Sequence, residues 1–136
     1  MKGELHKHDV VYYVQVTDWG GIMTDPKLYE LRVVGGGDVV IRYTQTDRPS
    51  LIEREWRSRF TARVEASPQE AWRSALRHLY RRLRETESAQ IRSASALAKV
   101  GRELDLDPEL PLRMDEIREC LTALLARYTP EIEESA

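Results

Sequence analysis

Hydrophobic residues alternate with polar ones along the first half of the chain, a pattern typical of β-strands. Residues 10–16 (VVYYVQV) are rich in β-branched and aromatic side chains. In residues 27–34 the side chains at alternate positions, Tyr29, Leu31 and Val33, are apolar and would lie on one side of a strand. A third such run, residues 39–46, follows three glycines and an aspartate. Because glycine readily adopts positive φ, residues 35–38 predict a tight hairpin between the second and third strands.

A longer alternating segment follows a turn predicted at residues 47–50. Its apolar side chains would share one face and its charged side chains the other, as in an antiparallel strand with one solvated face. The apolar set is Ile52, Trp56, Phe60, Ala62 and Val64, and the charged set is Glu53, Glu55, Arg57, Arg59, Arg63 and Glu65. We therefore expect a fourth strand whose apolar set is buried.

The hydrophobic period changes to that of an α-helix at Ser67. Pro68 follows it and Glu70 stands three residues on, which together form a capping box with proline at the first helical position. The apolar side chains that recur at helical spacing are Trp72, Ala75, Leu76, Leu79 and Leu83. This face is expected to dock on the sheet, and the helix is expected to end near residue 87 or 88.

The second half of the chain predicts at least one further helix. Residues 88–98 are mostly small and carry a weak apolar stripe, and the link containing Pro108 and Pro111 cannot be helical throughout. A last helix is predicted at residues 114–128, and an acidic tail at residues 129–136 is expected to fray.

Strands precede helices, so the predicted fold class is α+β. An N-terminal antiparallel sheet of about four strands, within residues 10–65, is packed by two or three C-terminal α-helices within residues 68–128. With 136 residues and 41% hydrophobic content, the chain can bury one core but is too short for two domains of ordinary size. We expect a single domain over residues 1–136.

One flank of the first predicted helix is cationic. The arginines on it are Arg73, Arg77, Arg81 and Arg84. At 100° per residue they lie roughly 100° to 180° from Trp72, on the side away from the apolar face. The flank can be a solvated ion-paired face, a protein contact or a nucleic-acid contact. In the nucleic-acid interpretation, Arg57, Arg59 and Arg63 would add cations from the exposed sheet face.

A second candidate contact is the connection predicted at residues 17–26. Trp19, Ile22 and Met23 interrupt this Gly/Asp-rich segment without a local periodicity that explains them. They either fold under the edge of the sheet or form exposed anchors for a protein partner, since aromatic and methionine side chains are favoured at interfaces.

The chain carries no catalytic or cofactor signature. His6 and His8 could share a metal only with a third ligand that the sequence does not indicate, and His78 has no evident nucleophile nearby. Cys120 is expected to be a small core residue, and the glycines at 35–37 lack the lysine and helix of a phosphate loop. We expect a non-enzymatic protein without metal, cofactor or small-molecule substrate.

Charge and composition narrow the class of protein further. Residues 48–102 carry 13 basic and 6 acidic side chains, whereas residues 103–136 carry 3 and 10, and the net charge is −2. This balance argues against non-specific coating of nucleic acid. No hydrophobic signal region follows the N-terminus and no apolar run is long enough to span a membrane, so a cytoplasmic location is expected. Asparagine is absent and arginine outnumbers lysine 17 to 4, which favours a thermophilic source.

The chain resembles the small proteins by which phages of thermophilic bacteria bind and inhibit host RNA polymerase. The resemblance rests on size, on the order of a small sheet followed by helices, on the Asn-free, Arg-rich composition, and on features such as the hairpin at residues 35–37 and the cap at residues 67–70. It implies a non-catalytic regulator that binds RNA polymerase in the host cytoplasm and alters promoter use. The resemblance assigns no contact residue to this chain. Phage inhibitors of host defence systems would have the same general size, layout and composition.

Overall fold

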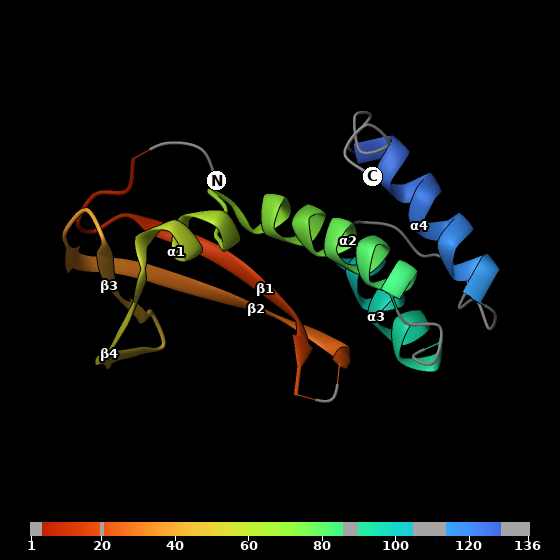
Figure 1. The fold of residues 1–136 in the computed structure, drawn as a ribbon, viewed down its shortest axis with the longest axis horizontal. Helices are drawn as coiled ribbons and strands as arrows, with labels where there is room; N and C mark the ends of the chain where they lie inside the picture. Colours follow the sequence, from red (N-terminus) through yellow and green to blue (C-terminus); the bar gives the residue numbers. More distant parts are fainter. Residues whose placement is uncertain (1–3, 20, 86–89, 105–113, 129–136) are drawn as a thin grey trace. The chain divides into compact units, whose positions relative to one another are not determined.

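The computed structural model describes residues 4–19, 21–85, 90–104 and 114–128. The elements are β1 (Val10–Asp18), β2 (Gly21–Gly36), β3 (Val40–Gln45), β4 (Arg48–Trp56), α1 (Arg57–Arg63), α2 (Pro68–Glu85), α3 (Gln90–Glu103) and α4 (Met114–Tyr128). The four strands form one antiparallel sheet in the order β1-β2-β3-β4, and the helices follow them in the chain (Figure 1), which confirms the predicted α+β fold.

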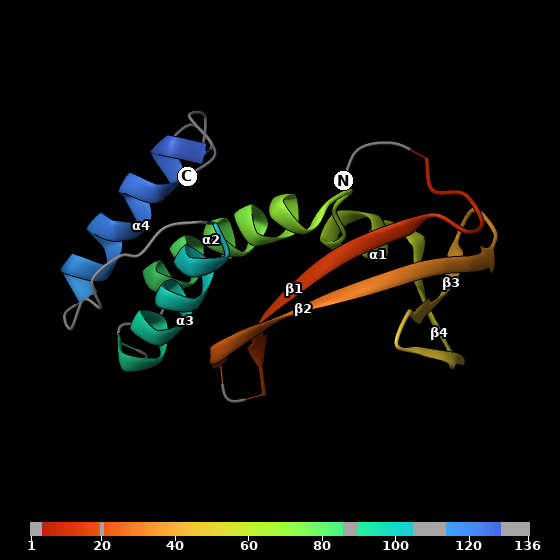
Figure 2. The ribbon, with the colours of Figure 1, turned by 180° about the vertical axis from the view of Figure 1, so that it is seen from behind.

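The chain forms two compact units. Unit 1 comprises Met1–Tyr13 and Leu28–Ala71, and unit 2 comprises Val14–Lys27 and Trp72–Ala136. Strands β1 and β2 run side by side in both views (Figures 1 and 2) and contribute to both units. Each unit is described by itself below.

The hairpin between β2 and β3 lies where the glycines predict it. Gly36 pairs with Ile41 and has a φ of 126°, a conformation that L side chains rarely adopt. A Cβ atom at position 36 would also lie 2.5 Å from the carbonyl oxygen of Val40. The backbone of Gly36 therefore requires glycine. Strand β2 begins at Gly21, earlier than predicted, so most of the connection predicted at residues 17–26 is strand.

The prediction of the fourth strand is wrong in two respects: the strand ends at Trp56, and its apolar residues before that point are exposed instead of buried. Residues 57–63 form helix α1, while Ile52 and Trp56 are 57% and 55% exposed. Phe60 and Val64 are buried as predicted, but they are four residues apart on a helical turn. Alternate positions include pairs at a spacing of four, so the same apolar pattern fits a strand and a helix. The other misassigned member of the set, Ala62, is exposed.

The core of unit 1 lies on one face of the sheet, which we call the inner face. Its buried members are Leu5, Val11, Leu31, Val33, Ile41, Tyr43, Phe60 and Val64. Helix α1 contributes Phe60, whose ring centroid lies 4.7 Å from that of Tyr43 on β3. Burial of such side chains stabilises a fold by about 1.5 to 3 kcal/mol each before entropy is counted. The opposite side of the sheet is its outer face.

The two edges of the sheet differ within unit 1. Beside β1, Tyr12 and Glu65 exchange backbone hydrogen bonds of 2.8 and 2.7 Å, so the segment after α1 occupies that edge. Strand β4 is the last in the order, and no other strand of the described residues pairs with it. The edge of β4 is therefore open.

Unit 2 holds α3, α4, the tip of the β1–β2 hairpin and most of α2, whose first residues belong to unit 1. Ser67 Oγ accepts a hydrogen bond of 3.2 Å from the N–H of Glu70, which confirms the predicted start of α2. The apolar face of α2 is buried at Trp72, Ala75, Leu76 and Leu79, while the side chain of Leu83 lies outside the described part. Lys99 of α3 pairs with Asp25 of β2 at 3.4 Å.

The remaining helix boundaries follow the sequence pattern. Helix α4 spans Met114–Tyr128 as predicted, with Ile117 and Leu121 buried. Helix α2 ends at Glu85 and α3 begins at Gln90, and the break predicted near residues 87 and 88 lies outside the described residues. None of the described helices is long and apolar enough to cross a membrane.

Candidate binding surfaces

The arginine flank of α2 is only partly exposed. Arg73 and Arg77 are half-buried and Arg81 is exposed, while the side chain of Arg84 lies outside the described part. The Nε atoms of Arg73 and Arg77 are buried, and that of Arg77 has no hydrogen-bond partner among the described residues. The aliphatic parts of the Arg73 and Arg77 side chains therefore cover apolar surface. The flank is not a continuous exposed row of cations.

The three apolar residues of the predicted connection at 17–26 are separated by the structure. Trp19 stands fully exposed at the tip of the β1–β2 hairpin, Ile22 is buried and Met23 is half-buried. An open hollow of about 360 Å³ lies beside them. Its lining residues are Asp18, Trp19, Ile22, Met23, Thr24 and Arg92. Of the three, Trp19 alone is exposed.

The arginines expected on the exposed sheet face lie in α1 instead. Arg57 Nε donates a hydrogen bond of 2.8 Å to the carbonyl of Gly37, which ties α1 to the β2–β3 turn. Arg63 points into the inner face, and Arg59 is exposed on the helix. The prediction that these arginines line the sheet face is wrong because the segment is helical.

Arg63 is the centre of a polar and aromatic cluster. Its guanidinium carbon lies 4.6 Å from the ring centroid of Tyr13, 5.5 Å from that of Tyr43 and 5.3 Å from that of Phe60. Its Nη2 donates a hydrogen bond of 3.0 Å to the hydroxyl of Tyr43 and lies 2.9 Å from Oε2 of Glu55. Burial raises the pKa of both tyrosines, and Arg63 partly opposes this by lowering it. The cluster joins α1 to the sheet.

Three exposed arginines lie on the outer face of the sheet, one on each of three adjacent strands. Arg42 of β3 pairs with Arg54 of β4, and Arg32 of β2 pairs with Thr44, which lies two residues from Arg42 on the same side of β3. Directly paired residues of antiparallel strands share a face. No ion pair involves Arg32, Arg42 or Arg54 within the described residues. These three arginines are therefore cations without an ion-pair partner among the described residues.

Arg42 and Arg54 are directly paired residues of β3 and β4. The N–H of Arg57 donates 2.8 Å to the carbonyl of Val39, so the alternation of an antiparallel ladder makes Arg42 and Arg54 a non-hydrogen-bonded pair. Side chains approach most closely in such pairs, and like charges directly opposite destabilise a sheet. Arg42 extends over Gly35 of β2, since a Cβ atom there would lie 2.8 Å from its Nη2. Glycine at position 35 thus lets Arg42 turn away from Arg54.

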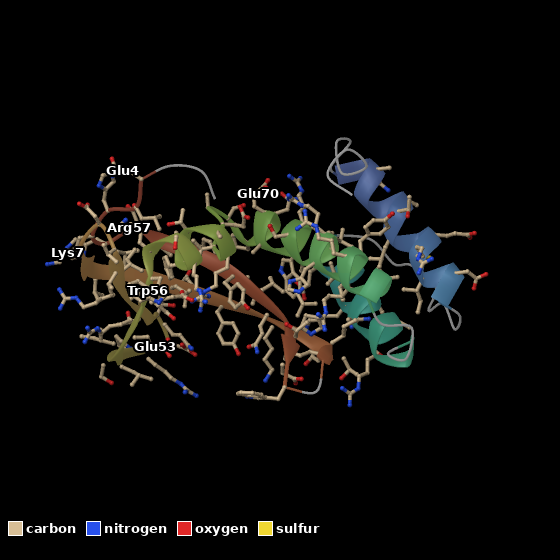
Figure 3. All side chains as sticks on the ribbon, in the orientation of Figure 1. Glu4, Lys7, Glu53, Trp56, Arg57 and Glu70 are labelled. Atoms are coloured by element: carbon tan, nitrogen blue, oxygen red, sulfur yellow. The ribbon has the colours of Figure 1, made fainter. Side chains whose placement is uncertain are left out.

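Trp56, labelled in Figure 3, is an exposed tryptophan at the end of β4. It occupies the N-cap of α1, makes no side-chain cap hydrogen bond there, and precedes a first turn without acidic residues. N-caps favour Ser, Thr, Asp and Asn, so tryptophan forgoes about 1 kcal/mol of capping at this position. Alternation along β4 places Ile52, Arg54 and Trp56 on the outer face.

We define the β4 surface as Arg32, Arg42, Ile52, Arg54 and Trp56. Sequence reasoning missed the arginines because they stand singly in three strands, and only the strand register brings them together.

Neither metal ligands nor known relatives indicate another site. Within the described residues, no three His, Cys, Asp or Glu side chains are grouped to hold a metal ion. Comparison with models of protein families, with curated proteins and with solved structures finds no match to the chain. The chemistry of its surface is therefore the guide to its function.

Proposed function

We propose that the chain is a non-catalytic regulatory protein that binds a protein partner through the β4 surface. The supporting observation is the unneutralised Arg42–Arg54 pair beside the exposed Trp56. The two cations have no ion-pair partner among the described residues, and the tryptophan side chain is exposed. An acidic and apolar patch on a partner would neutralise the cations and cover the tryptophan.

The composition of the surface favours a protein over a nucleic acid. Tryptophan and arginine are enriched among the residues that dominate protein interfaces, and Ile52 adds aliphatic area that a phosphate backbone does not use. Single-stranded nucleic-acid platforms combine cations with aromatic side chains for successive bases. On the outer face, Trp56 is the one large aromatic residue that is exposed among those described. A nucleic-acid-binding module is the alternative.

RNA polymerase is the partner to test first. This choice comes from the resemblance in layout and composition to polymerase inhibitors of thermophile phages, and it stays a prediction. An inhibitor of a host defence system would use the same kind of surface against a different protein.

The proposal is tested by affinity capture from a lysate of the source bacterium, or of the host if the chain is phage-encoded. Wild type is compared with the double variant Arg42→Glu/Arg54→Glu, and Arg59→Glu serves as a control because Arg59 is exposed on α1 outside the β4 surface. We expect a protein that wild type and control retain and that the double variant loses. RNA polymerase subunits in this set would support the specific prediction. Equal capture by all three proteins would exclude the β4 surface as the contact.

A direct binding measurement separates the nucleic-acid alternative. Fluorescence anisotropy with a labelled single-stranded oligonucleotide is followed at increasing salt. Micromolar or tighter affinity at about 150 mM salt that falls steeply as salt rises, and that is lost in the double variant, would favour the nucleic-acid module.

A further inference from the structure

We infer that the open edge of β4 accepts an extended segment of the partner as an added strand, and that this segment carries an acidic residue opposite Arg54. The inference rests on the proposed function, because it concerns the same surface. It specifies the mode of binding and the chemistry of the bound segment.

The backbone of β4 has hydrogen-bonding groups that face away from the sheet. The hydrogen bond from Arg57 to Val39 fixes which residues of β4 point their N–H and C=O groups toward β3, namely Glu53 and Glu55. By alternation, the N–H and C=O groups of Arg54 and the N–H of Trp56 point toward the open edge. The C=O of Trp56, the N-cap residue, accepts the first hydrogen bond of α1 instead. A row of unpaired groups at an exposed edge is a template for strand addition.

A second copy of the chain is a poor occupant of this edge in the registers centred on its charged residues. Antiparallel pairing of two β4 strands about a two-fold axis requires one residue to face its own copy. If that residue is Arg54, arginine faces arginine and Glu53 faces Glu55. If it is Glu53 or Glu55, two carboxylates face each other. Each of these registers sets like charges directly opposite, which destabilises the pair. A register centred on Ile52 sets no like charges opposite, and the oligomeric state tests it.

The charges of β4 define the complementary segment. Arg54 on the outer face has no ion pair among the described residues, and neither does the half-buried Glu53 on the inner side, labelled in Figure 3. Glu55 is already neutralised by Arg63 at 2.9 Å. A matching strand therefore carries an acidic residue opposite Arg54, a basic residue next to it opposite Glu53, and apolar residues two positions away, beside Ile52 and Trp56.

The first test uses two synthetic peptides with blocked ends. The matching peptide has the central sequence Val-Lys-Glu-Lys-Val, and the control inverts its charges to Val-Glu-Lys-Glu-Val. Amide hydrogen exchange of the wild-type protein is measured with each peptide at millimolar concentration. We expect the matching peptide to slow exchange at Arg54 and Trp56 by roughly tenfold or more, and the control to have little effect. No protection by either peptide, or equal protection by both, would overturn the inference.

The second test separates strand addition from simple surface contact. Arg54→Pro and Arg54→Ala both remove the charge, but only proline also removes the N–H that faces the open edge, and proline is tolerated on edge strands. With the matching peptide, Arg54→Pro is expected to bind at least roughly tenfold more weakly than Arg54→Ala. Equal binding by two folded variants would overturn strand addition, while the capture experiment would still decide the proposed function independently.

The oligomeric state tests whether a second copy of the chain occupies the β4 edge. We expect the wild type to stay monomeric over the concentration range of analytical ultracentrifugation. A dimer that dissociates on Arg54→Pro would show that a second copy occupies the edge, and would overturn the assignment of the edge to an acidic partner segment. If Arg54→Pro does not fold, the exchange measurement on the wild type decides alone.

Discussion

Oε2 of Glu55 lies 2.9 Å from Nε and 2.9 Å from Nη2 of Arg63, so a single carboxylate oxygen of β4 contacts two nitrogens of the α1 guanidinium. This double contact aligns the guanidinium over the rings of Tyr13 and Phe60. Helix α1 is thereby held on the inner face by a polar contact in addition to the buried Phe60.

Replacing Arg63 by leucine should destabilise the fold. The change removes the contacts with aromatic rings and leaves Glu55 partly buried without its cation, so we expect a loss of about 1 to 3 kcal/mol in the free energy of unfolding. Arg59→Ala, at an exposed position of the same helix, should change it by less than about 0.5 kcal/mol. Urea denaturation measures both. A leucine variant as stable as the control would show that the cluster contributes little.

Trp56 and Phe60 should respond in opposite ways to substitution, although the sequence pattern assigns both to one buried face. Trp56→Ser supplies a side-chain cap to α1 and should keep or raise stability, by up to about 1 kcal/mol. Phe60→Ala empties a fully buried site and should cost about 3 to 5 kcal/mol. Thermal unfolding compares the variants, and Trp56→Ser should weaken partner capture although the protein stays folded. A large loss of stability in Trp56→Ser would contradict the assignment of Trp56 to binding.

Substitution of the arginines of α2 should change the free energy of unfolding more where the side chain is more deeply buried. Arg81→Glu at an exposed position should change the free energy of unfolding by less than about 0.5 kcal/mol. Arg77→Glu places a carboxylate where the Nε atom is buried, and should cost about 1 to 2 kcal/mol. Leu79→Ala, in the buried face, should cost about 2 to 5 kcal/mol. Equal effects of the two arginine variants in denaturant titration would show that the flank is uniformly solvated.

Stability should decline in alkaline solution as buried tyrosines ionise. Burial raises the pKa of Tyr13 and Tyr43 above the ordinary value of 10.0, so the folded state holds these protons more tightly than the unfolded state. The resulting stabilisation is complete below about pH 10 and is lost as pH rises through the raised pKa. Urea unfolding at about pH 8 and about pH 11 measures the loss. Tyr43→Phe should reduce this dependence, and an unchanged slope would exclude Tyr43 as a source.

Local signals predicted the elements whose ends depend on nearby residues. Ser67 and Glu70 set the start of α2 through one hydrogen bond, and the positive φ of Gly36 sets the β2–β3 turn. Neither depends on distant parts of the chain. The same holds for α4, whose apolar stripe and following proline predict its bounds.

The sequence could not predict which face of β4 is buried. Phe60 and Val64 satisfy both a strand and a helix period, and in the structure Phe60 packs against Tyr43 from a helix. The β4 surface depends on the register of the strands. This register shifts at two irregularities, one between Val33 and Gly35 and one between Tyr43 and Gln45. A shift of one residue moves a side chain to the other face, so the arginine row is a tertiary feature.

The backbone bridge between Tyr12 and Glu65 determines how large a strand-added complex can become. Because this bridge occupies the β1 edge in unit 1, an extended segment can join this unit only beside β4. Growth of a sheet from chain to chain requires two available edges, whereas here the first segment to bind uses the only open one among the described residues of unit 1. Titration should therefore saturate at one segment for each unit 1, and this unit should not extend into a fibre.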